Sequence, residues 1–173
     1  KAGGSPGADD SPSSAGIVWV NEVLTHTDPP LKDTIELYNP TTSSVNIGYW
    51  YLTDDRTVPK KFRITPGTSI PPGGYLVLSE DDFNPTPGVP PSFTLNSHGE
   101  EVYLYSADAN GNLTGYSDGF SFPAAANGVS FGRHRISTGE ILYPAQTANT
   151  FGSANPGPRV GRVVINEIHY QPA

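Results

Sequence analysis

The stretch IVWVNEV at residues 17–23 decides the fold class of this chain. Val18 and Val20 occupy alternate positions, with Trp19 between them. Because successive side chains of a β-strand point to opposite faces, this period of two predicts a strand with one buried face. The same alternation places Glu22 on the face of the two valines and Trp19 on the other face.

A second stretch, TIELYN at residues 34–39, shows the same alternation. Ile35 and Leu37 face one way, and Glu36 and Tyr38 face the other. We therefore expect a second half-buried strand shortly after the first.

Further strands follow along the chain. Apolar clusters predict them at residues 45–52, 75–79, 102–105 and 116–122. The run YLVLS at 75–79 is almost wholly apolar, which is typical of a central strand. The tetrapeptide DANG at 108–111 predicts a hairpin that joins the last two of these strands.

Composition supports an all-β domain with many turns. The 173 residues include 19 Gly and 18 Pro, which interrupt the chain too often for a coiled coil or a helical bundle. They also exclude a transmembrane helix, which needs about 20 apolar residues. A net charge of −7 opposes nucleic acid and anionic lipid as partners. The lack of Cys excludes disulfides and a cysteine nucleophile.

Four segments make up the expected organisation of the chain. Residues 1–16 are almost entirely Gly, Ser, Pro, Ala and Asp, which predicts a flexible linker. One domain is expected over residues 17–155, followed by a second linker at 156–162. Residues 163–173 are interpreted as the opening strand of a truncated following repeat. Because the chain also lacks a starting Met, we expect it to be a fragment of a longer protein.

The repeat interpretation rests on one short similarity. VVINEI at residues 163–168 repeats the pattern of VWVNEV at residues 18–23. A strand separated from its own domain can add to an exposed sheet edge. We therefore expect strand-mediated self-association through residues 163–170.

Six blocks of sequence, in order, resemble the bacterial branch of the lamin tail domain family. They are an INEI-type opening strand, D-x-IELYNP, V-x-I-x-x-W-x-L-x-D, F-x-I, IPPGGYLVLS and G-x-x-V-x-L-Y. The resemblance covers residues 17–155 and implies an immunoglobulin-like β-sandwich with Trp50 in its core. The segment from Asn149 to Gly157 is similar to the usual ending of the family. One departure is Tyr49, where bacterial members usually carry Gly.

No motif in the sequence indicates an enzyme. Neither a G-x-S-x-G nucleophile motif nor an HExxH zinc motif occurs. We therefore expect no catalytic and no cofactor-binding residues.

Calcium is the metal that needs consideration. Asp108, Asn110 and Asn112 have the spacing of a calcium loop, but the Gly and Glu that such a loop needs further on are missing. A weaker alternative is a cluster of Glu22, Glu36 and Asp33, which would repel one another unless a cation or a proton intervened. The competing interpretation is structural, with the Asn21-Glu22 pair hydrogen bonding a neighbouring loop.

Tyr49 and Tyr51 are the candidates for surface binding. They flank Trp50, and the alternation of a strand sends at least one of the three side chains outward. Outward aromatic rings on a β-sandwich can stack against sugars. Contact across the sheet is the alternative interpretation of the same residues.

Together these observations predict a non-catalytic interaction or structural module. The resemblance implies that it is part of a larger multi-domain bacterial protein, secreted or at the cell surface. The expected partner is a protein or a cell-surface component, without nucleic acid and without membrane insertion. The alternative function is a calcium-dependent or carbohydrate-binding accessory domain of an extracellular enzyme.

Overall fold

The structure is a computed structural model that describes residues 17–161. The predicted linker at 1–16 and the predicted repeat at 163–173 lie outside the described residues. Nearly all regular structure is β-strand. The elements are β1 (Trp19–Leu24), β2 (Thr34–Tyr38), β3 (Val45–Asn46), β4 (Tyr51–Thr53), β5 (Phe62–Arg63), β6 (Ser69–Ile70), β7 (Tyr75–Ser79), α1 (Glu80–Phe83), β8 (Gly99–Ala107), β9 (Leu113–Pro123), β10 (Phe131–Gly132), β11 (His134–Arg135) and β12 (Ile141–Leu142).

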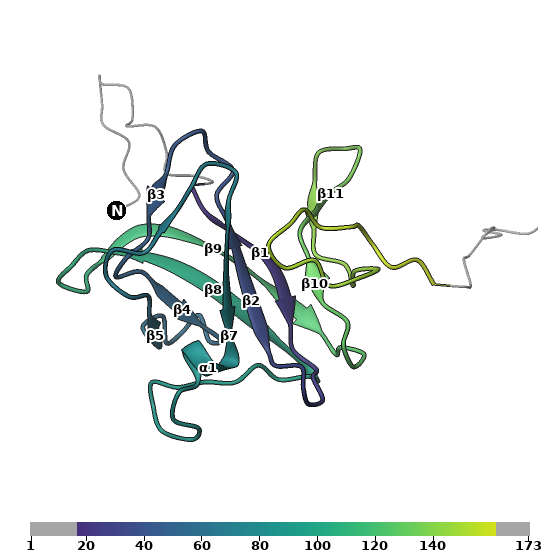
Figure 1. Cartoon of the computed structure of the whole chain (residues 1–173), viewed down its shortest axis with the longest axis horizontal. Coiled ribbons are helices and arrows are strands. Elements are labelled where there is room, and N and C mark those ends of the chain that lie inside the picture. The colour runs from purple at the N-terminus through teal and green to yellow at the C-terminus, as the bar shows by residue number, and fades with distance from the viewer. Residues whose placement is uncertain (1–16, 162–173) are drawn as a thin grey trace, which may run out of the picture.

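Two four-stranded antiparallel sheets form the two layers of a sandwich (Figure 1). The first sheet has the order β10-β1-β2-β7, and the second has the order β5-β4-β8-β9. Two short pairs, β3-β6 and β11-β12, extend from these layers. The predicted all-β sandwich is therefore confirmed.

The hydrophobic core lies between the two sheets. Val20, Ile35 and Leu37 of the first sheet and Leu52 and Leu104 of the second are fully buried in one cluster. Burying a side chain of this size contributes about 1.5–3 kcal/mol. The core therefore fixes the inner face of each sheet and leaves the outer faces to other roles.

A β-bulge in β1 changes which residues face outward. Val20 pairs with Leu37, but the next pair is Glu22 with Glu36, so Asn21 is an extra residue on β1. The prediction that Glu22 shares the face of the valines is therefore wrong, because the extra residue reverses the alternation. Glu22 lies beside Glu36 on the outer face of the sheet.

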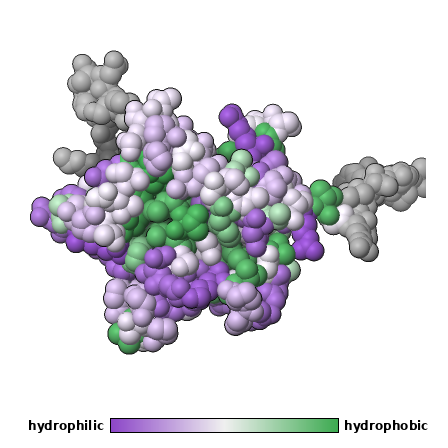
Figure 2. Space-filling view, in the orientation of Figure 1, coloured by the Kyte–Doolittle hydropathy of each residue, from purple (hydrophilic) through white to green (hydrophobic). Residues whose placement is uncertain are grey.

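Strand β7 is an edge strand, and the prediction that it is central is wrong. It pairs only with β2 among the described residues. Its apolar composition has a different cause: Leu76 and Leu78 pack toward the core, while Val77 faces outward with 41% of its surface exposed. Figure 2 shows hydrophobic side chains gathered in the middle of the face on which β7 lies.

The hairpin predicted at residues 108–111 joins β8 to β9 and is confirmed. Asp108 accepts hydrogen bonds from the backbone N–H groups of Asn110 and Asn112, both at 2.9 Å. Gly111 has a φ of 81°, which only glycine adopts without strain. The Asp and Asn side chains at this turn are thus explained by its geometry.

The end of the described chain is attached to the domain. The backbone of Gly157 accepts a hydrogen bond from Thr147 at 3.2 Å, and Arg159 donates one to Ala145 at 2.7 Å. Residues 157–159, which belong to the predicted linker, therefore pair with the preceding segment. Within residues 17–161, no helix has the length and apolar character needed to cross a membrane.

Candidate binding groove

Three aromatic side chains form a ladder across the outer face of the first sheet. Trp19 on β1 pairs in register with Tyr38 on β2, which pairs with Tyr75 on β7. Their ring centroids are 5.8 Å and 4.8 Å apart, and all three side chains are half-buried. Each ring lies outside because its strand neighbours fill the core. The ladder therefore offers a continuous aromatic surface to solvent.

This ladder is the floor of a groove of about 510 Å³. Its walls come from the C-terminal part of the described chain, namely Arg133, β11, the turn at Gly139, β12 and the segment at 154–155. Figure 1 shows this green and yellow part of the chain beside β1. The volume falls within the range of about 300–1,000 Å³ that is typical of ligand sites. The groove is lined by Trp19, Asn21, Tyr38, Tyr75, Arg133, Arg135, Gly139, Ile141, Ala154 and Asn155.

Both charged residues that line the groove are arginines. The Arg133 guanidinium lies 3.9 Å from the centre of the Trp19 ring, and its Nη1 donates to the Tyr143 hydroxyl at 2.9 Å. Arg135 is exposed at the end of β11. Within residues 17–161 neither arginine forms an ion pair. Arg133 also lowers the pKa of Asp118, against a larger rise caused by burial of that carboxyl group.

Hydrogen bonds between Asn21 and Asn155 hold one wall against the floor. The Asn21 side chain donates to the Asn155 Oδ1 at 2.9 Å. In return, the Asn155 Nδ2 donates to the backbone oxygens of Asn21 at 3.1 Å and Arg133 at 3.0 Å. These contacts commit both amides to positioning the wall.

Glu22 anchors the adjoining part of the same segment. It is fully buried, and its carboxylate accepts hydrogen bonds from the backbone N–H and the hydroxyl of Thr150, each at 3.2 Å. It also accepts a bond of 2.5 Å from the Ser130 hydroxyl. The predicted role of the Asn21-Glu22 pair, hydrogen bonding to a neighbouring loop, is confirmed.

Glu36 makes the second anchor beside it. Its two oxygens accept hydrogen bonds from the Asn21 Nδ2 at 2.7 Å and from the Gly152 N–H at 2.5 Å. Burial raises the pKa of Glu36 from 4.5 to about 7, and the charge of Glu22 adds to the rise, while the two hydrogen bonds oppose it. The carboxylate thus binds a proton more tightly than an exposed glutamate does.

Asp33 does not join the two glutamates. It accepts hydrogen bonds from the Thr27 hydroxyl at 3.0 Å and the Leu95 N–H at 3.2 Å. Burial raises its pKa to about 6. Among residues 17–161 no three or more His, Cys, Asp or Glu side chains are placed to hold one metal ion. Glu22 and Glu36 lie side by side in the fold. Asp33, the third member of the cluster expected from the sequence, lies apart from them and binds Thr27 and Leu95 instead.

Tyr49 and Tyr51, the surface residues singled out from the sequence, lie near the second sheet. The Arg63 guanidinium covers both rings, at 4.8 Å from the centroid of Tyr49 and 5.9 Å from that of Tyr51. Arg63 also donates to the Ala109 backbone oxygen at 2.7 Å. Trp50 between them is 9% exposed and belongs to the core, as the resemblance implied.

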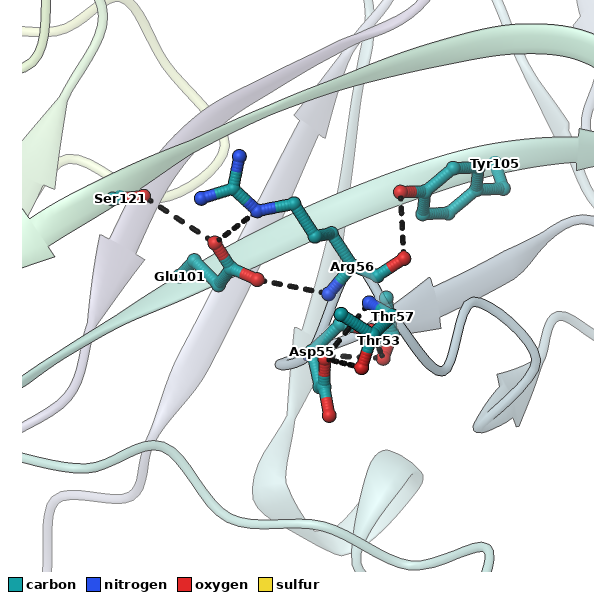
Figure 3. Close-up of polar contacts among 7 residues, drawn as sticks. All are labelled: Thr53, Asp55, Arg56, Thr57, Glu101, Tyr105 and Ser121. Carbon is teal, nitrogen blue, oxygen red and sulfur yellow. Dashed lines mark hydrogen bonds and ion pairs between the residues drawn. The ribbon is translucent and has the colours of Figure 1, made fainter.

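The outer face of the second sheet carries a cluster of polar residues that form hydrogen bonds and an ion pair with one another (Figure 3). The Arg56 Nε lies 3.0 Å from a Glu101 carboxylate oxygen, and the Arg56 backbone N–H donates to the other oxygen at 2.8 Å. The Tyr105 hydroxyl contacts the Arg56 carbonyl at 3.5 Å. This arrangement holds the loop after β4 on the sheet. The charges of Arg56 and Glu101 neutralise each other in an ion pair. Arg133 and Arg135 in the groove differ from Arg56, because neither forms an ion pair within the described residues.

Sequence reasoning did not identify the groove. It placed Trp19 and Tyr38 outside the core but did not connect them, because residues far apart in sequence become neighbours only through strand register. A usable signal existed: an aromatic residue stands at an outward position in each of three strands, including Tyr75. Arg133 and Arg135 carried no such signal, because their position depends on how the C-terminal part folds back.

Comparison with known proteins identifies the fold family. The Lamin Tail Domain pattern matches residues 11–122, more than half of the chain. No curated protein and no solved structure matches the chain. The matched range includes the three floor residues, whereas Arg133, Arg135 and Asn155 lie beyond it. The predicted immunoglobulin-like β-sandwich is thereby confirmed, and the chain belongs to the lamin tail domain family, whose members have a non-enzymatic immunoglobulin-like fold.

Proposed function

We propose that this chain is a non-catalytic interaction module of a larger multi-domain bacterial protein, secreted or at the cell surface. Its partner is a component of the cell surface, and it binds in the aromatic groove. The observation that carries the proposal is the half-exposed ladder of Trp19, Tyr38 and Tyr75 in a walled groove. Immunoglobulin-like lamin tail domains serve as interaction or structural domains, which supports a binding role.

The construction of the groove also favours binding. Aromatic side chains give large contact area at low entropic cost and dominate binding energies when they are pre-positioned. Here cross-strand pairing fixes the rings, and the Glu22 and Glu36 anchors fix the adjoining wall. A rigid site loses little conformational entropy on binding.

The test is binding of the fluorescently labelled full chain to intact bacterial cells and to isolated cell envelopes. Tyr38→Ala removes the middle ring of the ladder, and we expect it to weaken binding tenfold or more. Tyr51→Ala is the matched control, because it removes an aromatic ring from the outer face of the other sheet. It should leave binding unchanged. Circular dichroism melts of both variants confirm that they fold.

The two variants distinguish the competing sites. Loss of binding in Tyr51→Ala, with Tyr38→Ala unaffected, would move the site to Tyr49 and Tyr51. Unchanged binding in both variants would refute the groove as the binding site. A parallel series with EDTA and with added calcium tests the calcium-dependent alternative, which requires that chelation abolish binding.

A further inference from the structure

We propose that the groove binds an acidic polysaccharide, a glycan chain whose sugar rings carry carboxylate groups. The inference rests on the proposed function and names the chemical class of the ligand. Two independent features of the groove carry it: the shape of its aromatic floor and the sign of its charge.

The floor suits sugar rings. The planar faces of Trp and Tyr pack against the C–H faces of pyranose rings, and the hydroxyl of Tyr remains free to bond the sugar's edge. Trp19 and Tyr38 are tilted by 51°, and Tyr38 and Tyr75 by 34°. The three rings are therefore not coplanar, and the floor is not flat. Such a floor fits a single twisted glycan chain better than the flat face of a crystalline polymer.

The charge of the groove selects carboxylates. The protein carries a net charge of −7, yet the two charged residues that line the groove, Arg133 and Arg135, are both positive. A guanidinium presents paired N–H donors that match a carboxylate. Stacking on Trp19 and the bond to Tyr143 hold Arg133 in place. Arg135 is exposed beside it, so a chain lying along the floor would meet positive charge at its edge.

Other ligand classes fit this groove less well. A peptide strand adds to a free sheet edge through its backbone, but the floor lies on a sheet face, where the main chain of β2 is already paired on both sides. A neutral glycan would use the aromatic floor but would leave the exposed Arg135 without an anionic partner.

Six of the ten residues that line the groove lie outside the family match. The arginines and the wall at 154–155 follow residue 122, where the match ends. The immunoglobulin-like sheets supply the floor, and the chain's C-terminal part supplies the charge.

The experiment measures binding of the full chain to polygalacturonate, alginate and hyaluronate by affinity electrophoresis and calorimetry. Fully methyl-esterified polygalacturonate is the matched control ligand, since it has the same backbone with its carboxylates masked. We expect binding to at least one acidic polymer, at least tenfold weaker binding once its carboxylates are masked, and a marked loss of affinity with added salt.

Two charge variants complete the design. Arg135→Gln is exposed and should not disturb folding, and we expect it to weaken binding about tenfold. Arg56→Gln removes an arginine from the other sheet and should leave binding unchanged. Equal effects of the two substitutions would overturn the inference, because the loss would then reflect net charge and not the groove.

The remaining outcomes separate this inference from the proposed function. Equal binding of masked and unmasked polymer would overturn carboxylate recognition. Binding of poly-glutamate as strong as that of the glycans would point to an acidic protein partner. If all three polymers fail to bind while Tyr38→Ala still abolishes binding to cells, the inference is wrong and the proposed function stands. If cell binding fails as well, both are wrong.

Discussion

Glu36 should make this protein less stable as the pH rises from 4.5 to about 7. Burial raises the pKa of its carboxyl group from 4.5 to about 7 in the folded protein. The unfolded chain therefore releases this proton near pH 4.5, whereas the folded protein keeps it until about pH 7. The stabilising contribution of the protonated group is full below 4.5, declines across this interval and is lost above it.

The size of the effect follows from the two pKa values. An interval from 4.5 to about 7 corresponds to about 3 kcal/mol, at about 1.4 kcal/mol for each pKa unit. Glu36 is fully buried, so solvent screening reduces this value little. Asp33, with its pKa raised to about 6, acts in the same direction and contributes to the total pH dependence.

The assay compares the wild type with Glu36→Gln by urea unfolding at several pH values from about 4.5 to about 7.5. Gln keeps the volume and an oxygen that can accept the Gly152 N–H bond, but it does not titrate. We expect the stability of the wild type relative to this variant to fall by about 3 kcal/mol across the range. Glu140→Gln, at an exposed position, is the control and should run parallel to the wild type.

The opposite slope would refute this reasoning. If the wild type gains stability relative to Glu36→Gln as the pH rises, the hydrogen bonds from Gly152 and Asn21 outweigh burial, and the carboxylate is stable as an anion. Parallel curves for the two proteins would show that burial does not raise the pKa at all. The variant Asp33→Asn measures how much of the pH dependence of stability comes from Asp33.

Three further changes test other parts of the structure. Glu22→Ala leaves the Ser130 hydroxyl and the Thr150 amide without their acceptor, so we expect a loss of about 3 kcal/mol in urea unfolding and faster proteolysis within residues 147–158; an unchanged midpoint would contradict the anchor. Gly119→Ala puts a Cβ 2.1 Å from the Val102 carbonyl oxygen, so a loss of about 3 kcal/mol is expected, and wild-type stability would show that the two strands can separate there. Removal of residues 163–173 should reduce self-association in sedimentation velocity, and an unaltered mass distribution would remove that role.

Local sequence patterns predicted the strands well where a strand alternates regularly. In β2, Ile35 and Leu37 are buried between the sheets, and Tyr38 faces outward, as the alternation requires. The hairpin at residues 108–111 followed from turn chemistry alone, because Asp, Asn and Gly each have a specific role there. These features depend on neighbours within a few residues, so the sequence contains the information needed to predict them.

The same patterns failed where a distant partner sets the outcome. The bulge at Asn21 leaves no mark in the alternation, yet it turns Glu22 toward Glu36 and creates the paired anchors. The composition of β7 resembles that of a central strand, because an edge strand that covers a core is apolar as well. The predicted surface residues Tyr49 and Tyr51 remain a prediction, which the Tyr51→Ala control addresses.

Sequence alone established an all-β domain, its turns, its acidic charge and its resemblance to lamin tail domains. The groove was decided by the tertiary structure, because Trp19, Tyr38 and Tyr75 stand in three strands and only the strand register makes them neighbours. Its arginines stand 58 and 60 residues after Tyr75, in a segment that folds back beside the sheet. Periodicity reports on which face a side chain lies, but the residues that meet on that face are set by strand pairing and chain return.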